Sequence, residues 1–334
     1  MKKPNLHSVI LCILMMLSFG FAACTSNNST LEKEARSKSS QFTAMAIRAY
    51  QTNDFEKAKD YCNAALEQIE SKTGGSHFLK TVDKEYANAK MILGNLFLTT
   101  GNDTSAYFNY KDALKYIGAN DSENLFKVNC YLTQVTNSAG VGNTISNKYL
   151  KNATSYCRDE KDAVYLLLMK MQVAALMFEK TSFQNMIDST ISLANYLDES
   201  SKKTLLHQIS FYELYADCID PFEFKEQVVK ELDSMIIAES QNKFRVARLI
   251  YTKGAYLLNF PEKINESRAE LEKSLALSRR CKYYRISLYS LRMLNECYKK
   301  LKNEPAYRAA KSELLRLQAI DIPYVIYARE LGNN

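Results

Sequence analysis

His77 and His207 are the histidines that follow the first 23 residues, and 130 positions separate them. A histidine that binds zinc, acts as a general base or joins a catalytic triad needs partner side chains close by, and no local motif supplies them. Gly74-Gly75 has no following lysine, so a phosphate-binding loop is not indicated. Asp159-Glu160 and Asp198-Glu199 stand where helices are expected to begin or end, as capping carboxylates do. We therefore expect no enzyme activity, no metal and no cofactor.

Cys24 is the residue with the clearest chemical assignment. Lys2 and Lys3 form a positively charged N-terminal region, and an apolar run of 11 residues follows over 9–19. Ala22-Ala23 directly precede the cysteine. This pattern is typical of a secretory signal peptide, and the apolar run is too short to span a membrane. The Ala-Ala-Cys ending resembles a bacterial lipobox, which implies that Cys24 is acylated and becomes the mature N-terminus. A plain secretory signal with an incidental cysteine is the alternative.

Six further cysteines are scattered along the chain without any Cys-x-x-Cys pair, so a zinc site or a dithiol redox motif is not indicated. An even number of cysteines in an exported chain permits disulfides. Cysteines inside apolar helical patterns, in contrast, usually act as small buried hydrophobes. We favour mostly buried thiols at Cys62, Cys130, Cys157, Cys218, Cys281 and Cys297.

The charge of the mature chain is uneven. Residues 243–316 hold 18 Lys and Arg against 7 Asp and Glu, a net charge of +11. The whole chain carries +7, and loss of Lys2 and Lys3 leaves +5, so the rest of the mature chain carries −6. The excess of positive charge in residues 243–316 either reflects solvated helix faces or marks a surface for an acidic partner. Such a partner could be lipid head groups, an anionic glycan or an acidic protein. Nucleic acid is not an expected partner of an exported chain.

Helices should dominate the fold, because the 334 residues contain only 10 Gly and 5 Pro. Apolar residues also recur at helical spacing in the centre of the chain. After a signal peptide over residues 1–23, the polar segment 24–39 indicates a flexible tether. We expect an all-α repeat domain over residues 40–331, with about seven helical hairpins and a C-terminal capping helix at 322–331.

One segment combines small, aromatic and turn-forming residues at fixed spacings. Gly94 would let the paired helix approach closely, and Gly101 would supply a left-handed turn. Ala106 is small where two helices are expected to cross. The segment resembles a tetratricopeptide (TPR) repeat through Leu93, Gly94, Phe97, Gly101, Asn102, Ala106, Tyr110, Ala113 and Leu114.

Other segments match this pattern less completely. In residues 46–66, Asn53 replaces the turn glycine, which its tolerance of left-handed backbone permits. Residues 291–315 depart from the pattern at Tyr307, where a small residue is expected. Gly254 suggests another unit 160 residues after Gly94, a distance that corresponds to four units of 40 residues. The usual TPR unit has about 34 residues. The resemblance implies a TPR-like superhelical solenoid.

In TPR proteins the first helix of each hairpin lines a concave groove that holds a peptide or helix of a partner. Arginine and tyrosine dominate interface hot spots, and arginine can bind a carboxylate with two hydrogen bonds. The alternative is that the tyrosines only pack within or between repeats. The resemblance assigns the partner-binding groove to Tyr50, Asn88, Met91, Asn95, Arg248, Tyr251, Tyr289, Arg292 and Glu296.

Together these features predict a non-catalytic, lipid-anchored scaffold of the Gram-negative cell envelope that binds proteins or peptides. An aspartate after the lipidated cysteine tends to retain such lipoproteins in the inner membrane, so Thr25 favours the outer membrane, facing the periplasm. Two other classes stay open. One is a glycan-binding lipoprotein of a nutrient-uptake system, although the chain has no Trp for a sugar platform. The other is an extracytoplasmic sensor that acts through a separate membrane partner.

Overall fold

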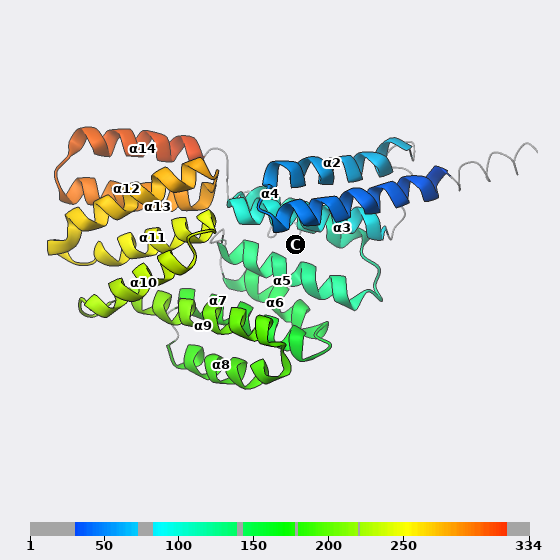
Figure 1. The fold of residues 1–334 in the computed structure, drawn as a ribbon, viewed down its shortest axis with the longest axis horizontal. Coiled ribbons are helices and arrows are strands. Elements are labelled where there is room, and N and C mark those ends of the chain that lie inside the picture. The colour runs from blue at the N-terminus through cyan, green and yellow to red at the C-terminus, as the bar shows by residue number, and fades with distance from the viewer. Residues whose placement is uncertain (1–30, 73–82, 139–142, 178–179, 220, 319–334) are drawn as a thin grey trace, which may run out of the picture. The chain divides into compact units, whose positions relative to one another are not determined.

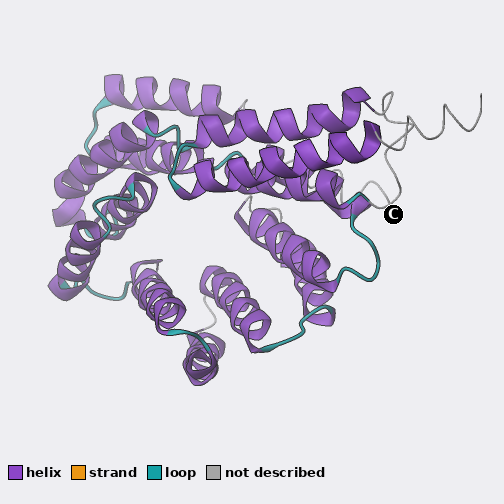
Figure 2. Cartoon of the chain, turned by 45° about the vertical axis from the view of Figure 1, so that its right-hand side comes forward, coloured by secondary structure: helices purple, strands orange, loops and turns teal. Residues whose placement is uncertain are grey.

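The computed structural model describes residues 31–72, 83–138, 143–177, 180–219 and 221–318. In this part of the chain 14 α-helices pack as adjacent antiparallel pairs, and Figure 2 shows no strand among them. This confirms the all-α prediction and is consistent with a helical repeat. Cys24, His77, the expected signal peptide and the expected capping helix lie outside the described residues.

The first helix covers residues 31–51. The helices that follow are α2 (Phe55–Lys72), α3 (Lys84–Thr100), α4 (Asp103–Tyr116), α5 (Ser122–Ser138), α6 (Asn143–Ser155), α7 (Glu160–Met177), α8 (Lys180–Leu193), α9 (Glu199–Ile219), α10 (Glu226–Ala238), α11 (Lys243–Leu257), α12 (Ile264–Arg280), α13 (Tyr284–Lys300) and α14 (Glu304–Gln318). Two short 3₁₀ helices, Ala194–Tyr196 and Pro261–Lys263, precede α9 and α12. No helix among the described residues is long and apolar enough to cross a membrane.

The chain forms two compact units, the first of residues 1–93 and 115–118 and the second of 94–114 and 119–334. In the first unit the opening helix starts at residue 31, inside the segment expected to be a tether. Ala35 and Ser39 are fully buried on one face of this helix. Between them, Arg36 Nη1 lies 2.7 Å from Oδ1 of the buried Asp83, before α3. These contacts explain why residues 31–39 are helical despite their polar composition.

Four helix-to-helix turns share one geometry, which supports a repeated architecture. Each contains a residue with left-handed backbone, at φ 60°, 78°, 55° and 55° for Asn53, Gly101, Lys282 and Lys302. The N–H of the next residue donates to the carbonyl five positions earlier, at 2.9, 2.8, 2.7 and 2.9 Å respectively. This is the Schellman closure of a helix C-terminus. The left-handed turns expected at Asn53 and Gly101 are therefore confirmed.

The odd-numbered helices of the second unit contact one another in chain order, from α5 through α7, α9 and α11 to α13. From α3 onward the odd-numbered helices begin at residues 84, 122, 160, 199, 243 and 284, so their starts lie 38 to 44 residues apart. This spacing agrees with the expected unit of 40. The helices α11, α12 and α13 each pack against the next helix along the chain (Figure 1).

Two glycines mark close approaches between paired helices of the second unit. A Cβ on Gly94 would lie 2.4 Å from the Tyr110 ring of α4, and a Cβ on Gly254 would lie 2.7 Å from the Leu271 side chain of α12. Ser267 Oγ donates to the Gly254 carbonyl at 2.7 Å and tightens the second approach. The predicted role of Gly94 is confirmed, and Gly254 has the same role in its own pair.

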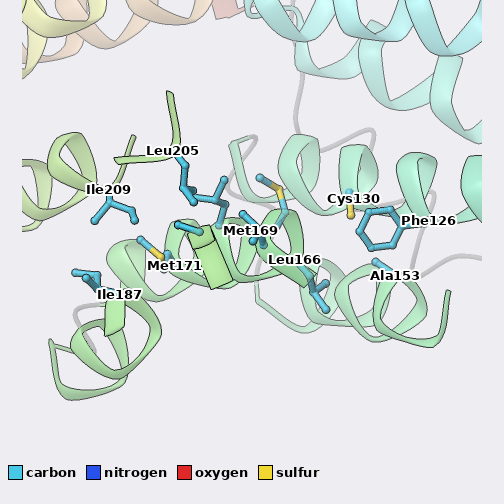
Figure 3. Close-up of a cluster of buried hydrophobic side chains, with 12 residues drawn as sticks. Phe126, Cys130, Ala153, Leu166, Met169, Met171, Ile187, Leu205 and Ile209 are labelled. Atoms are coloured by element: carbon cyan, nitrogen blue, oxygen red, sulfur yellow. The ribbon is translucent and has the colours of Figure 1, made fainter. Parts of the chain in front are cut away.

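The centre of the chain, where the repeat signature is weak, has a continuous apolar core. Figure 3 shows α7 lying between Phe126 of α5 on one side and Ile187 of α8 and Leu205 of α9 on the other. Met171 of α7 is fully buried in this cluster. Large side chains therefore join these helices where TPR repeats would use small ones.

Candidate functional site

Three consecutive odd-numbered helices, α9, α11 and α13 (labelled in Figure 1), contact one another in chain order. Their sequences carry a cluster of tyrosines and arginines. We call this cluster the Tyr–Arg row. The Tyr251 and Tyr289 rings lie 5.8 Å apart between centroids, so α11 and α13 meet through aromatic side chains. The row comprises Tyr215, Arg248, Tyr251, Tyr289 and Arg292.

Arg248 forms one end of the row. Its guanidinium carbon lies 4.1 Å from the ring centroid of Phe211, close enough for a cation–π interaction. Tyr215 stacks on the same Phe211 ring at 5.9 Å between centroids. Burial raises the pKa of the Tyr215 hydroxyl, and the nearby positive charge of Arg248 opposes that shift. Phe211 and Tyr215 of α9 therefore hold Arg248 in a fixed position.

Arg292 forms the other end, with its guanidinium carbon 6.0 Å from the Tyr289 ring centroid. Burial raises the pKa of Tyr289 to about 12, although Arg285 beside it acts in the opposite direction. Burial also raises the pKa of Tyr251, and Tyr215 and Tyr289 add to that shift. The tyrosines therefore stay neutral at physiological pH, and the charge of the row is carried by its arginines.

An ion pair in the second unit lies next to the row. Arg285 Nε donates to Asp103 Oδ2 at 3.2 Å, and Arg285 Nη2 also contacts Asp103 Oδ1. Burial of the Arg285 guanidinium disfavours its charge, but the Asp103 carboxylate outweighs this effect and raises the Arg285 pKa. Arg285 Nη2 donates further to the Leu98 carbonyl at 3.1 Å. Arg285 is thus satisfied within the fold and is not available to a ligand.

The chain has no match among protein-family models or curated protein sequences.

The structure brings together only some of the residues assigned to a groove. Arg248, Tyr251, Tyr289 and Arg292 form the row described above, whereas Tyr50, Asn88 and Met91 belong to the first unit. Met91 is buried, with 7% of its surface exposed, so it contributes to the core. The Tyr50 ring packs on Phe55, with 5.5 Å between centroids.

Two other predicted groove residues are engaged within the protein. Asn95 Oδ1 accepts a hydrogen bond from the Tyr110 hydroxyl at 2.7 Å, which links α3 to α4. Glu296 forms an exposed ion pair with Lys299 at 3.2 Å, one turn along α13. Asn95 therefore has a structural contact that sequence spacing does not reveal, and Glu296 lies on the exposed surface of its helix.

The six described cysteines are free thiols, and four of them, Cys62, Cys130, Cys218 and Cys297, are buried. This agrees with the interpretation as buried thiols. Burial raises the pKa of Cys62, Cys130 and Cys218 to about 12, so their reactive thiolate forms are suppressed. Within the described ranges, no group of three or more His, Cys, Asp or Glu side chains could hold a metal ion.

Sequence reasoning missed Phe211 and Tyr215, which lie at the Arg248 end of the row. They lie one helical turn apart on α9, in a segment without the small-residue signature of a repeat. Their spacing of four residues puts them on one face of a helix. This spacing is the sequence signal that could have identified Phe211 and Tyr215 as neighbours on α9.

Proposed function

We propose that this protein is a non-catalytic, lipid-anchored scaffold of the cell envelope, and that its helices form a TPR-like superhelical solenoid. The repeat spacing of 38 to 44 residues and the four matching turns support the architecture. The contacts between successive odd-numbered helices agree with the side-by-side first helices of TPR hairpins. Such a layer offers one long surface to a bound protein or peptide.

This proposal depends on the contacts of the two arginines at the ends of the Tyr–Arg row, Arg248 and Arg292. Each guanidinium lies over an aromatic ring, and neither has a carboxylate partner among the residues that the structure describes. Most other arginines of α11 to α14 are paired, for example Arg279 with Glu313. Arginines held by aromatic rings but left unpaired suit an acidic partner, because the edges of the guanidinium remain free to donate hydrogen bonds.

Crosslinking of the tagged protein in intact cells, followed by affinity capture, would test the row as a partner-binding surface. The double variant Arg248→Glu/Arg292→Glu should lose the captured partner while it keeps the helix content and melting temperature of the wild type. Capture of the purified partner should weaken as salt rises, because charges at the surface are screened beyond about 8 Å at physiological ionic strength.

Arg280 on α12 and Arg316 on α14 are exposed arginines outside the row and provide a matched control. The variant Arg280→Glu/Arg316→Glu makes the same change in net charge and should retain the partner. Equal recovery with both double variants would show that the row is only a solvated surface, and partner binding would then have to be sought in the first unit.

Attachment through Cys24 is a separate part of the proposal. The Cys24→Ala variant should lose labelling by a clickable palmitate analogue and leave the membrane fraction. A Cys12→Ala variant, which changes a cysteine inside the expected signal peptide, should behave as the wild type. Persistent labelling and membrane retention of Cys24→Ala would contradict lipid anchoring.

A further inference from the structure

A cavity of about 220 Å³ opens within the layer of odd-numbered helices in the second unit. Its lining comes from α5, α7, α9 and α11, together with Glu239 after α10. It shares Arg248 with the Tyr–Arg row, but Tyr289 and Arg292 do not line it. The cavity is smaller than the range of about 300–1,000 Å³ typical of drug-sized ligands, so it suits a small metabolite.

Arg248 is the strongest anchoring group in this cavity. The Phe211 ring, which also lines the cavity, covers one face of the guanidinium at 4.1 Å. Stacking occupies the face of the guanidinium and leaves the N–H donors in its plane free, which is the arrangement that binds a carboxylate with two hydrogen bonds. The ring also restricts the side chain before a ligand arrives, so less conformational entropy is lost on binding.

The charges around the cavity favour an anion with a single negative charge. Glu239 also lines the cavity, but its carboxylate lies 2.7 Å from Nη1 of Arg245, another lining residue. The pair is neutral overall, and Arg248 adds one formal positive charge. A dianion would meet the Glu239 carboxylate without a second unpaired cation to balance it.

Three half-buried polar side chains complete the polar part of the wall. The amides of Gln134 and Gln208 and the hydroxyl of Tyr212 make no hydrogen bond within the described part of the protein. Half-buried polar groups usually find a hydrogen-bond partner in the protein, in water or in a ligand. These groups can therefore donate to or accept from a small molecule bound beside Arg248.

Apart from the hydroxyl of Tyr165, the remaining wall is apolar. Leu168, Met169 and Leu249 are buried, with 8%, 6% and 4% of their surface exposed, and all three line the cavity. We propose that this cavity binds a small monocarboxylate with an apolar body, in which Arg248 holds the carboxylate and the leucines and methionine contact the body. This site goes beyond the scaffold function, because its ligand is a free small molecule and its binding needs no partner protein.

Titration calorimetry and saturation-transfer NMR on the purified full chain would test the site with phenylacetate and isovalerate as probes. Both should bind at one molecule per chain. Phenylacetamide and isovaleramide keep the apolar body but lack the charge, and acetate keeps the charge but lacks the body, so all three should bind at least about tenfold more weakly. These comparisons use the wild type and do not depend on whether a variant folds.

Variants assign the binding to named groups. Arg248→Gln should weaken phenylacetate binding by about ten- to a hundredfold, Arg248→Lys should weaken it less, and Arg280→Gln on α12 should leave it unchanged. No binding of any carboxylate, equal binding of the amides, or unchanged binding by Arg248→Gln would overturn the proposal. Displacement of phenylacetate by an equal concentration of a blocked peptide with one central glutamate would overturn the free-acid assignment in favour of a partner side chain.

Discussion

Arg285 in the first turn of α13 pairs with Asp103, the first residue of α4, across 182 residues of sequence. A cation is unfavourable at a helix N-terminus and a carboxylate is favourable there, so Asp103 stabilises its own helix and compensates Arg285 in the other. Only 4% of the Asp103 side chain and 15% of the Arg285 side chain are exposed. The pair therefore has little solvent screening.

Removal of one partner from this pair should destabilise the second unit strongly, because the other charge stays buried without compensation. We expect Arg285→Met to lower the free energy of unfolding by about 3–5 kcal/mol. The double variant Arg285→Met/Asp103→Asn should lose clearly less than the sum of the two single variants. Urea denaturation followed by circular dichroism, arranged as a double-mutant cycle, measures this coupling.

The exposed pair of Arg279 and Glu313 is the control for that cycle. Nearly half of the Arg279 side chain is exposed, at 48%. Arg279→Met should therefore change the unfolding free energy by only about 0–1 kcal/mol. Equal losses for Arg279→Met and Arg285→Met would contradict the assignment of Asp103 and Arg285 as a buried pair.

Overpacking should reveal the helix crossings that the repeat pattern predicts. Gly94 faces the Tyr110 ring of α4, and Ala106 of α4 is fully buried. We expect Gly94→Leu and Ala106→Leu each to cost about 1–3 kcal/mol of stability, because the added atoms have no space. The exposed Ala309 on α14 is the control, and Ala309→Leu should stay within about 0.5 kcal/mol. Unchanged denaturation midpoints for both buried variants would show that the assigned repeat register is wrong.

The cysteines should differ in their reaction with iodoacetamide. Cys157 and Cys281 are only partly buried, whereas Cys62, Cys130 and Cys218 are buried and have pKa values raised to about 12. In native protein at mildly alkaline pH, the partly buried pair should be modified first. Peptide mass spectrometry over a time course gives the order, and denaturant should abolish the difference. Modification of the three buried cysteines as fast as Cys157 in native protein would disprove the predicted burial.

Stability should fall at alkaline pH. Burial raises the pKa of Tyr289 to about 12 in the folded protein, from about 10 in an unfolded chain. The unfolded chain therefore loses this proton first, so the stabilisation is complete below about pH 10 and is lost as pH rises toward 12. Tyr289→Phe removes the titrating group, and its stability should decline less over that window. If the stability of the wild type and of Tyr289→Phe declined equally over this pH range, a contribution from Tyr289 would be refuted.

The sequence predicts the helical class, the close approach at Gly94 and the turns at Asn53 and Gly101, because each depends on local residue type or spacing. It does not predict the turn at Lys282, since lysine carries no preference for left-handed backbone. It also places Met91 in a groove, although this side chain is buried. A periodic pattern identifies one face of a helix but cannot show whether a neighbouring helix covers it.

The candidate site is less predictable from sequence than the fold. Arg248, Tyr251, Tyr289 and Arg292 come together because α11 and α13 share a repeat register that the small-residue pattern indicates. Phe211 comes from α9, where large apolar side chains replace that pattern. The contact of this ring with Arg248 depends on how α9 and α11 pack, which no single segment encodes.

The turn between α3 and α4 also touches α13, since a Cβ on Gly101 would lie 2.5 Å from the Arg285 backbone nitrogen. In an open repeat array each repeat contacts only its neighbours, so the ends can fray without disturbing the rest. Here the opening of either α4 or α13 would break the buried ion pair between Asp103 and Arg285. Backbone amides in these two helices should therefore exchange with deuterium at matching rates, as parts of one cooperative folding unit.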